Sequence, residues 1–235
     1  MKRLLPFVII LAVLAAALGT TWYLTRSASE HGSPTAQASP KQGATPAGPS
    51  DNVGPVDPGA DPPHTLGPAD ARAQLEEFGD FECPPCGLLH PILQQMSKEF
   101  GSRLRIIFRE FPLVPNHQHA LAAAHAAEAA GLQGKFWQMH DLLYQNQKTW
   151  HDAFDVRPIF EDYGKQIGLD VERYKQDLNS EIVERRIFLD GQRGHSLGVK
   201  GTPTVFLNGR EVPFESLPAE KLRVLIDAQL SGAHP

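Results

Sequence analysis

Residues 77–86 have the sequence EFGDFECPPC, which contains both cysteines of the 235-residue chain, Cys83 and Cys86. Two sulfur atoms at this spacing can close a disulfide or share a metal ion. A strand is predicted before the pair, over residues 73–78. A helix is predicted after it, because apolar residues recur at helical spacing over residues 88–100. The cysteines are therefore expected where a strand gives way to a helix.

This position favours thiolate chemistry. The first turn of a helix has unbonded N–H groups and the positive end of the helix dipole, which stabilise an anion. Cys83 lies at the predicted helix start and is the candidate nucleophile, while Cys86, one turn further in, is the candidate resolving thiol. Pro84 and Pro85 suit a first helical turn, where a missing N–H loses no hydrogen bond. A stabilised thiolate favours the reduced protein and makes its disulfide a stronger oxidant. We therefore favour a redox-active Cys83–Cys86 disulfide over the other uses of the two cysteines.

Other uses of the cysteines are weaker. A structural zinc site takes four ligands, and adding His90 to the cysteines supplies only three, so no metal is predicted. Haem attachment requires histidine directly after the second cysteine, where the chain has Gly87. A purely structural disulfide would close a loop too small to constrain the unfolded chain. His90 is predicted to lie on the surface. His117, His119 and His125 lack acidic or thiol companions and predict a solvated helix face.

The chain beyond the cysteines alternates between strand and helix patterns. Residues 103–111 (RLRIIFREF) predict a strand, and residues 116–194 contain several amphipathic helices. Strand signals return at residues 204–207, followed by the hairpin dipeptide Asn208-Gly209, a short return strand and a helix over residues 217–230. The predicted order is β-α-β, a helical insertion, then β-β-α, which is an α/β fold.

The N-terminal residues 1–26 predict export. Lys2 and Arg3 precede an apolar run of about the 20 residues that cross a bilayer, with positive charge on the cytoplasmic side. Both a signal anchor and a cleaved signal peptide fit this pattern. Trp22 and Tyr23 are typical of a membrane interface and favour the anchor. In either case the rest of the chain lies outside the cytoplasm, where disulfides persist.

Residues 27–65 are rich in proline, alanine and serine and predict a disordered linker. Residues 66–232 then suffice for one domain with a hydrophobic core. The net charge of -5 argues against a nucleic-acid partner, and a monomer is expected.

In combination, EFGDFECPPC and the GTPT at residues 201–204 resemble the DsbA-like branch of the thioredoxin superfamily. The resemblance covers nearly the whole exported domain, including the helical insertion. It implies a thioredoxin fold without a bound cofactor, in which Cys83 is the nucleophile and Cys86 the resolving cysteine. It also implies that Pro203 is a cis-proline facing the disulfide. The backbone of Thr202 would then be free to pair with an extended substrate chain.

Glu77 matches the buried acid that this superfamily carries six residues before the first cysteine. At the end of a buried strand its carboxyl group is expected to have a raised pKa and to relay a proton from Cys86. Its neighbour Glu76 should point to the opposite face of the sheet. The best-studied oxidases have histidine where this chain has Pro85, which cannot donate a hydrogen bond. The resemblance therefore leaves the direction of electron flow open.

The resemblance implies a thiol–disulfide oxidoreductase that introduces disulfides into exported proteins, in the periplasm or on the exterior of the cell envelope. Its substrates would be reduced exported polypeptides, which Pro84, Pro85, Thr202 and Pro203 would contact. A quinone-linked membrane protein would reoxidise it. Two alternatives remain: a disulfide reductase or isomerase, and a non-enzymatic chaperone or binding module that uses the apolar groove around Pro203.

Overall fold

The structure is a computed structural model that describes residues 56–114 and 116–232. The predicted membrane segment at residues 1–26 lies outside these residues, as does the predicted linker up to residue 55. Within the described ranges no helix combines the length and the apolar character needed to cross a membrane.

A five-stranded sheet forms the centre of the fold, in the order β1-β3-β2-β4-β5. The two central strands, β2 (Ala73–Gly79) and β3 (Leu104–Glu110), are parallel. Strand β4 (Thr204–Leu207) pairs antiparallel with β2, and β5 (Arg210–Val212) pairs antiparallel with β4. The short strand β1 (His64–Leu66) pairs antiparallel with β3 at the other edge.

The predicted hairpin dipeptide joins β4 to β5. Asn208 and Gly209 have φ values of 47° and 79°, the left-handed backbone that a two-residue hairpin turn requires. The Asn208 side chain also ties the turn to the start of β2, because its Oδ1 accepts a hydrogen bond from the Gln74 N–H at 2.7 Å.

The ordered fold begins before residue 66, where the domain boundary was predicted. Residue 66 is the last residue of β1. The Ala60 N–H donates to Asp190 Oδ1 at 2.8 Å, and the Ala60 carbonyl accepts a hydrogen bond from Arg109 at 2.8 Å. Apolar periodicity gave no signal here, because this segment is held mainly by polar contacts and a three-residue strand.

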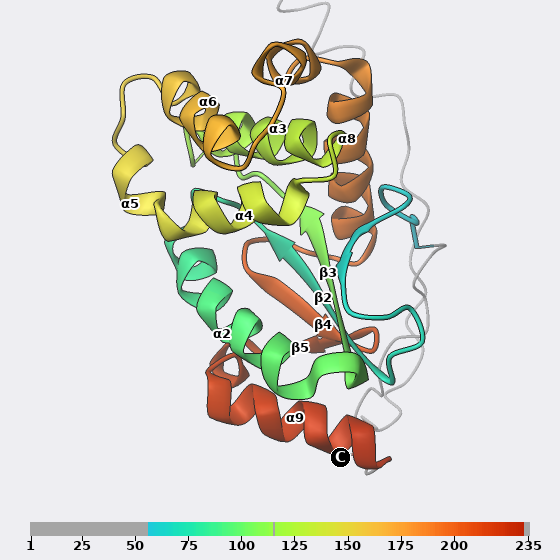
Figure 1. Cartoon of the computed structure of the whole chain (residues 1–235). Helices are drawn as coiled ribbons and strands as arrows, with labels where there is room; N and C mark the ends of the chain where they lie inside the picture. The colour runs from blue at the N-terminus through green and yellow to red at the C-terminus, as the bar shows by residue number, and fades with distance from the viewer. Residues whose placement is uncertain (1–55, 115, 233–235) are drawn as a thin grey trace, which may run out of the picture. The chain divides into compact units, whose positions relative to one another are not determined.

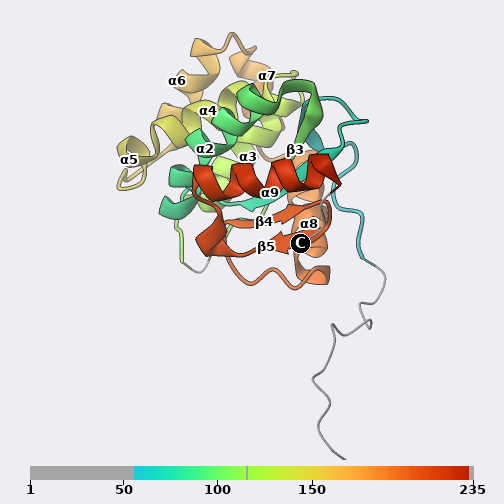
Figure 2. The ribbon, with the colours of Figure 1, turned by 90° about the horizontal axis from the view of Figure 1, so that it is seen from below.

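Helices cover both faces of the sheet (Figures 1 and 2). Helices α2 (Pro84–Phe100) and α9 (Ala219–Ser231) pack on one face, where apolar side chains of the sheet and both helices form a core. Helix α8 (Glu181–Ser196) packs on the other face, next to a smaller cluster around Phe78 and Phe206. Because side chains alternate along a strand, residues 75 and 77 of β2 face α2, while residues 76 and 78 face α8.

The predicted helical insertion lies between β3 and β4, at one end of the sheet (Figure 1). Two of its helices have side-chain caps: Asp170 accepts a hydrogen bond from the Arg173 N–H, and Ser180 accepts one from the Val183 N–H. Before α8 the insertion contains α3 (Ala120–Gly131), α4 (Phe136–Gln145), α5 (Gln147–Trp150), α6 (Arg157–Gln166) and α7 (Val171–Asp177). From β2 onward the predicted order β-α-β, helical insertion, β-β-α is confirmed, and β1 is an additional strand before it.

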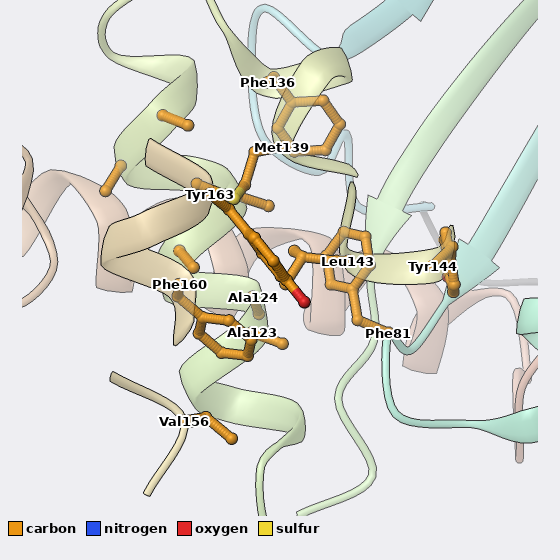
Figure 3. Close-up of a cluster of buried hydrophobic side chains, with 14 of the residues drawn as sticks. Phe81, Ala123, Ala124, Phe136, Met139, Leu143, Tyr144, Val156, Phe160 and Tyr163 are labelled. Carbon is orange, nitrogen blue, oxygen red and sulfur yellow. The ribbon is translucent and has the colours of Figure 1, made fainter. Parts of the chain in front are cut away.

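The insertion has its own hydrophobic core, which reaches the loop before the cysteines. Phe81 belongs to this core and packs against Tyr144 of α4, with ring centroids 4.9 Å apart. Figure 3 shows Phe81 beside Leu143 and Tyr144, with Phe160 and Tyr163 of α6 further into the same cluster. The cysteine-bearing loop is therefore packed against the insertion as well as the sheet.

A buried ion-pair network joins the sheet to α8. Arg109 of β3 donates to Glu76 of β2 and to Asp190 of α8, both at 2.8 Å, and Arg193 of α8 also binds Glu76. Glu76 thus points to the face opposite α2, as predicted. Buried charges persist where they are paired and hydrogen-bonded, as these are.

Candidate active site

Cys83 occupies the position that the sequence predicts, directly before helix α2, as its N-cap residue. Its N–H donates to the carbonyl of Asp80 at 3.1 Å, and its carbonyl accepts a hydrogen bond from the Gly87 N–H at 3.1 Å. Pro84 and Pro85 form the first helical turn, Pro84 exposed and Pro85 half-buried. The exposed fraction is 4% for Cys83 and 0% for Cys86, so Cys83 is the sulfur nearer to solvent.

The second predicted motif meets the first at this point. The Thr202–Pro203 peptide bond is cis. In its protonated form the Cys83 thiol donates to the Thr202 carbonyl, with 3.2 Å between Sγ and the oxygen, although the two residues are 119 positions apart. The fold therefore places the cysteine pair against the loop that leads into β4.

The two thiols differ in acidity. A hydrogen bond from the Cys86 side chain lowers the pKa of Cys83 to about 6; contact with Thr202 lowers it further, against the opposing effect of partial burial. Burial raises the pKa of Cys86 well above its usual value, and the negative charges of Cys83 and Glu77 nearby raise it further. At neutral pH the site accordingly holds a thiolate on Cys83 and a protonated thiol on Cys86.

Glu77 lies on the α2 face of β2, opposite Val205 of β4, with 2% of its surface exposed. Burial raises the pKa of its carboxyl group to about 8, and the charge of Cys83 contributes to the increase. Within the described residues its Oε1 atom has no hydrogen-bond partner. Glu77 is thus a buried acid close to the cysteines, as predicted.

Gln147 is a site residue that the sequence did not reveal. Its Nε2 donates to the carbonyls of Phe81 at 2.7 Å and Cys83 at 2.9 Å. A Cβ atom on residue 87 would lie 2.6 Å from Gln147 Oε1, so Gly87 leaves room for this contact. Gln147 lies 64 positions after Cys83, in a four-residue helix, and no local pattern marks it.

Asp80 organises the loop before Cys83. Its Oδ1 accepts a hydrogen bond from the Glu82 N–H at 2.8 Å, and its Oδ2 accepts from the Leu113 N–H at 2.8 Å. His117 Nδ1 lies 2.7 Å from the same Oδ2. The bond to Asp80 raises the pKa of His117, although burial opposes it, and the charge of Cys83 adds to the increase. The raised pKa favours the protonated form of His117 beside Asp80.

Three histidine predictions need correction. His117 and His119 do not lie on a solvated helix face: His117 binds Asp80, and the buried His119 donates its N–H to Glu82 Oε2 at 2.5 Å. His90 is buried rather than exposed, with Nε2 2.8 Å from Asp141 Oδ1. In each case the partner comes from a distant segment, which local spacing could not indicate. His125 is half-buried.

An apolar groove of about 460 Å³ adjoins the cysteine pair. Its exposed apolar side chains are Leu88 of α2, 74% exposed, and Phe214, 63% exposed, in the 3-10 turn Phe214–Ser216 before α9. Pro85 and Pro203 also line it. Exposed apolar side chains gathered beside a reactive group are typical of a surface that binds another molecule.

Comparisons with known proteins agree with this geometry. A family model described as Thioredoxin matches residues 60–228. By sequence, the chain is similar to the Na(+)/H(+) antiporter NhaA 3 of Salinispora tropica, with 36% identity over 94% of this chain and 33% of that protein. It is 37% identical to NhaA 1 of Mycolicibacterium gilvum, over 66% of this chain and 24% of that protein. The chain thus spans a third or less of these relatives' length.

Solved structures give the same fold. BdbD from Bacillus subtilis, in its oxidised form, superposes with a TM-score of 0.64 at 22% identity, covering 72% of this chain and 94% of that one. A thioredoxin-like oxidoreductase from Silicibacter pomeroyi has a TM-score of 0.62 at 25% identity, covering 73% and 94%. The thiol-disulfide exchange protein alpha-DsbA2 from Wolbachia pipientis has a TM-score of 0.58 at 21% identity, covering 70% and 86%.

Proposed function

The chain belongs to the thioredoxin family and has the fold of DsbA-like thiol–disulfide oxidoreductases, and we propose that it introduces disulfides into exported polypeptides through Cys83 and Cys86. The observation that carries this proposal is the asymmetry of the two thiols. Cys83 is acidic and is the less buried of the two, beside the cis-Pro203 loop, while Cys86 is fully buried and holds its proton.

The oxidised enzyme would act in two steps. A substrate thiolate attacks Cys83 Sγ, which forms a mixed disulfide and breaks the Cys83–Cys86 bond, leaving Cys86 as the thiolate. A second substrate thiolate then attacks the substrate sulfur of the mixed disulfide and releases Cys83 as the thiolate. Two electrons pass from the substrate dithiol to the enzyme. Because the Cys83 thiolate is the more stable of the two, Cys83 is the better leaving group in the second step.

Glu77 would carry the proton in this sequence. When the Cys83–Cys86 bond breaks, the thiolate formed at Cys86 needs a proton, because burial makes its charged form unfavourable. The carboxyl group of Glu77 is close enough to affect the pKa of Cys86 and keeps its own proton up to about pH 8. It can therefore protonate Cys86 as the substrate attacks Cys83.

Thr202, Pro203, Pro84 and Pro85 would form the surface that substrate contacts. The exposed Pro84 and half-buried Pro85 and Thr202 surround Cys83, and the groove with Leu88 and Phe214 continues from them. An unfolded polypeptide presents apolar side chains next to its cysteines, which this groove suits. The NhaA relatives are named for whole proteins of which this chain spans a third or less, so ion transport is not assigned to it.

The acidity of Cys83 supports the oxidising direction of electron flow. Stabilising a thiolate favours the reduced protein, so its disulfide is the stronger oxidant. We propose that the reaction takes place outside the cytoplasm and that residues 1–26 tether the protein to the membrane. A quinone-linked membrane protein would reoxidise it. The test is an equilibrium titration of the Cys83–Cys86 pair against glutathione. A potential near that of strong oxidants, about -120 mV, supports a disulfide donor, whereas one near -270 mV supports a reductase.

A thermal comparison gives an independent check on direction. For a disulfide donor the reduced form should melt at a higher temperature than the oxidised form, and the reverse order would reject the donor role. Cys83→Ser should abolish oxidation of a reduced dithiol peptide. Full activity in that variant would instead favour a binding module in which the cysteines play no part.

A further inference from the structure

A second cluster of titratable side chains lines a cavity together with Glu77. A cavity of about 90 Å³ separates β2 and β3 from helices α2 and α4. Its buried wall includes Glu77, His90 and His140, and its half-buried rim includes Trp137 and Asp141. The cavity is thus polar on one side and reaches the surface at Asp141.

Two imidazole groups converge on one carboxylate oxygen in this cavity. His90 Nε2 lies 2.8 Å from Asp141 Oδ1, and His140 Nδ1 lies 3.1 Å from the same atom. The donor atoms of all three residues lie within 4.8 Å of one another. Two ligands bound to one ion at roughly 2.0–2.2 Å, the usual zinc–imidazole and zinc–carboxylate distances, are themselves roughly 3 Å apart. The two nitrogen–oxygen distances therefore match the spacing of ligands to a single ion, and the ligand atoms of the two histidines lie within 4.8 Å of each other.

We propose that His90, His140 and Asp141 form a binding site for a divalent transition-metal ion, with Zn²⁺ the best match. Imidazole nitrogen with carboxylate oxygen suits zinc, whereas calcium and magnesium take oxygen ligands. Zinc accepts a site with three protein ligands and a fourth position that is open to a cavity. The half-exposed Asp141 gives the ion a path from solvent.

Glu77 is an independent observation for a ligand in this cavity. Its carboxyl group faces the cavity, is buried, and has an Oε1 atom without a hydrogen-bond partner among the described residues. A buried oxygen of this kind ordinarily has a partner. A water molecule bound to the metal ion in the cavity would supply the missing partner of Glu77 Oε1. The ion would then lie between the His90–His140–Asp141 cluster and the carboxyl group of Glu77.

Zinc binding to the full, tag-free chain tests the proposal. The Cys83–Cys86 disulfide is closed beforehand, so that neither thiolate can bind metal and the result is independent of the thiol chemistry. Titration with ZnCl₂ in a calorimeter should give one site per chain. His90→Gln, which preserves a hydrogen-bond donor for Asp141, and Asp141→Asn should each weaken binding by at least about tenfold.

The neighbouring His151–Asp152 pair provides a matched control. Its Nδ1–Oδ1 distance of 2.9 Å resembles that of His140 and Asp141, but it is exposed and belongs to no cluster of three metal-binding side chains in the described ranges. His151→Ala should leave zinc binding unchanged. The melting temperature should rise with Zn²⁺ in the wild type and in His151→Ala, and not in folded His90→Gln. Absence of stoichiometric binding to the wild type, or equal binding by folded His90→Gln, would overturn the proposal.

Discussion

The carboxyl group of Glu77 raises the pKa of the Cys86 thiol, adding to the larger effect of burial. Cys86 lies in the first turn of α2 and Glu77 lies on the strand that faces this helix, and burial disfavours the charged form of both groups. The first prediction concerns this acid.

Glu77→Gln should change how stability depends on pH. The pKa of Glu77 is about 8 in the folded protein and 4.5 in the unfolded chain, so the folded state binds more protons between these values. The contribution of Glu77 to stability therefore falls as pH rises from about 4.5 to 8, at up to about 1.4 kcal/mol per pH unit. The lowered pKa of Cys83 acts in the opposite sense above about pH 6. Urea unfolding of the reduced protein at pH 5 and pH 6 should therefore show a fall in the free energy of unfolding that Glu77→Gln lacks. The exposed Glu211→Gln should retain it.

The acidity of Cys83 should depend on the thiol of Cys86. Absorbance of the thiolate, followed against pH in the reduced protein, should give a midpoint near pH 6 for Cys83. Cys86→Ala removes the hydrogen bond that contributes most to this acidity, so the midpoint should rise. Cys86→Ser keeps a hydroxyl donor and should shift it less. Midpoints in both variants equal to that of the wild type would mean that the helix terminus, not Cys86, stabilises the thiolate.

The groove should affect the rate of reaction with polypeptide substrates and leave the rate with small thiols unchanged. Leu88→Ser removes an exposed apolar side chain from the groove wall and should lower kcat/KM for a reduced polypeptide by roughly five- to tenfold, because about 1 kcal/mol of apolar contact is lost. The reaction rate with glutathione should stay the same. Val224→Ser, at an exposed apolar position of α9 outside the groove, is the control. An equal loss of reaction rate with the reduced polypeptide and with glutathione would argue against a binding role for the groove.

The buried ion-pair network should be needed for stability. Arg109→Ala leaves Glu76 facing Arg193 alone and Asp190 without its guanidinium partner, and should cost about 3–5 kcal/mol in urea unfolding. Arg223→Ala removes a surface pair with Glu99 and should leave the unfolding midpoint almost unchanged. Similar losses of unfolding free energy in the two variants would mean that burial does not make the Arg109 ion pairs more important for stability than the surface pair.

The sequence predicted the framework well, because strands β2 to β4 and the helices carry strong apolar periodicity. The thioredoxin fold and the positions of Cys83, Glu77 and Pro203 followed from local motifs. What it could not predict are contacts between segments that only the fold brings together. Gln147 meets Cys83 from the insertion, and His90 is buried because Asp141 of α4 packs over it. Strand β1 was missed because three residues carry no periodicity.

The attachment of the cysteine loop to the insertion limits how the motif can be transplanted. Gln147 binds the carbonyl of Cys83, and His117 binds Asp80 just before it. A thioredoxin-fold protein that received only the four residues CPPC would acquire the sulfurs and the helix terminus without these two supports. Redesign of redox strength in this chain therefore has to treat α5 and the start of the insertion as parts of the motif.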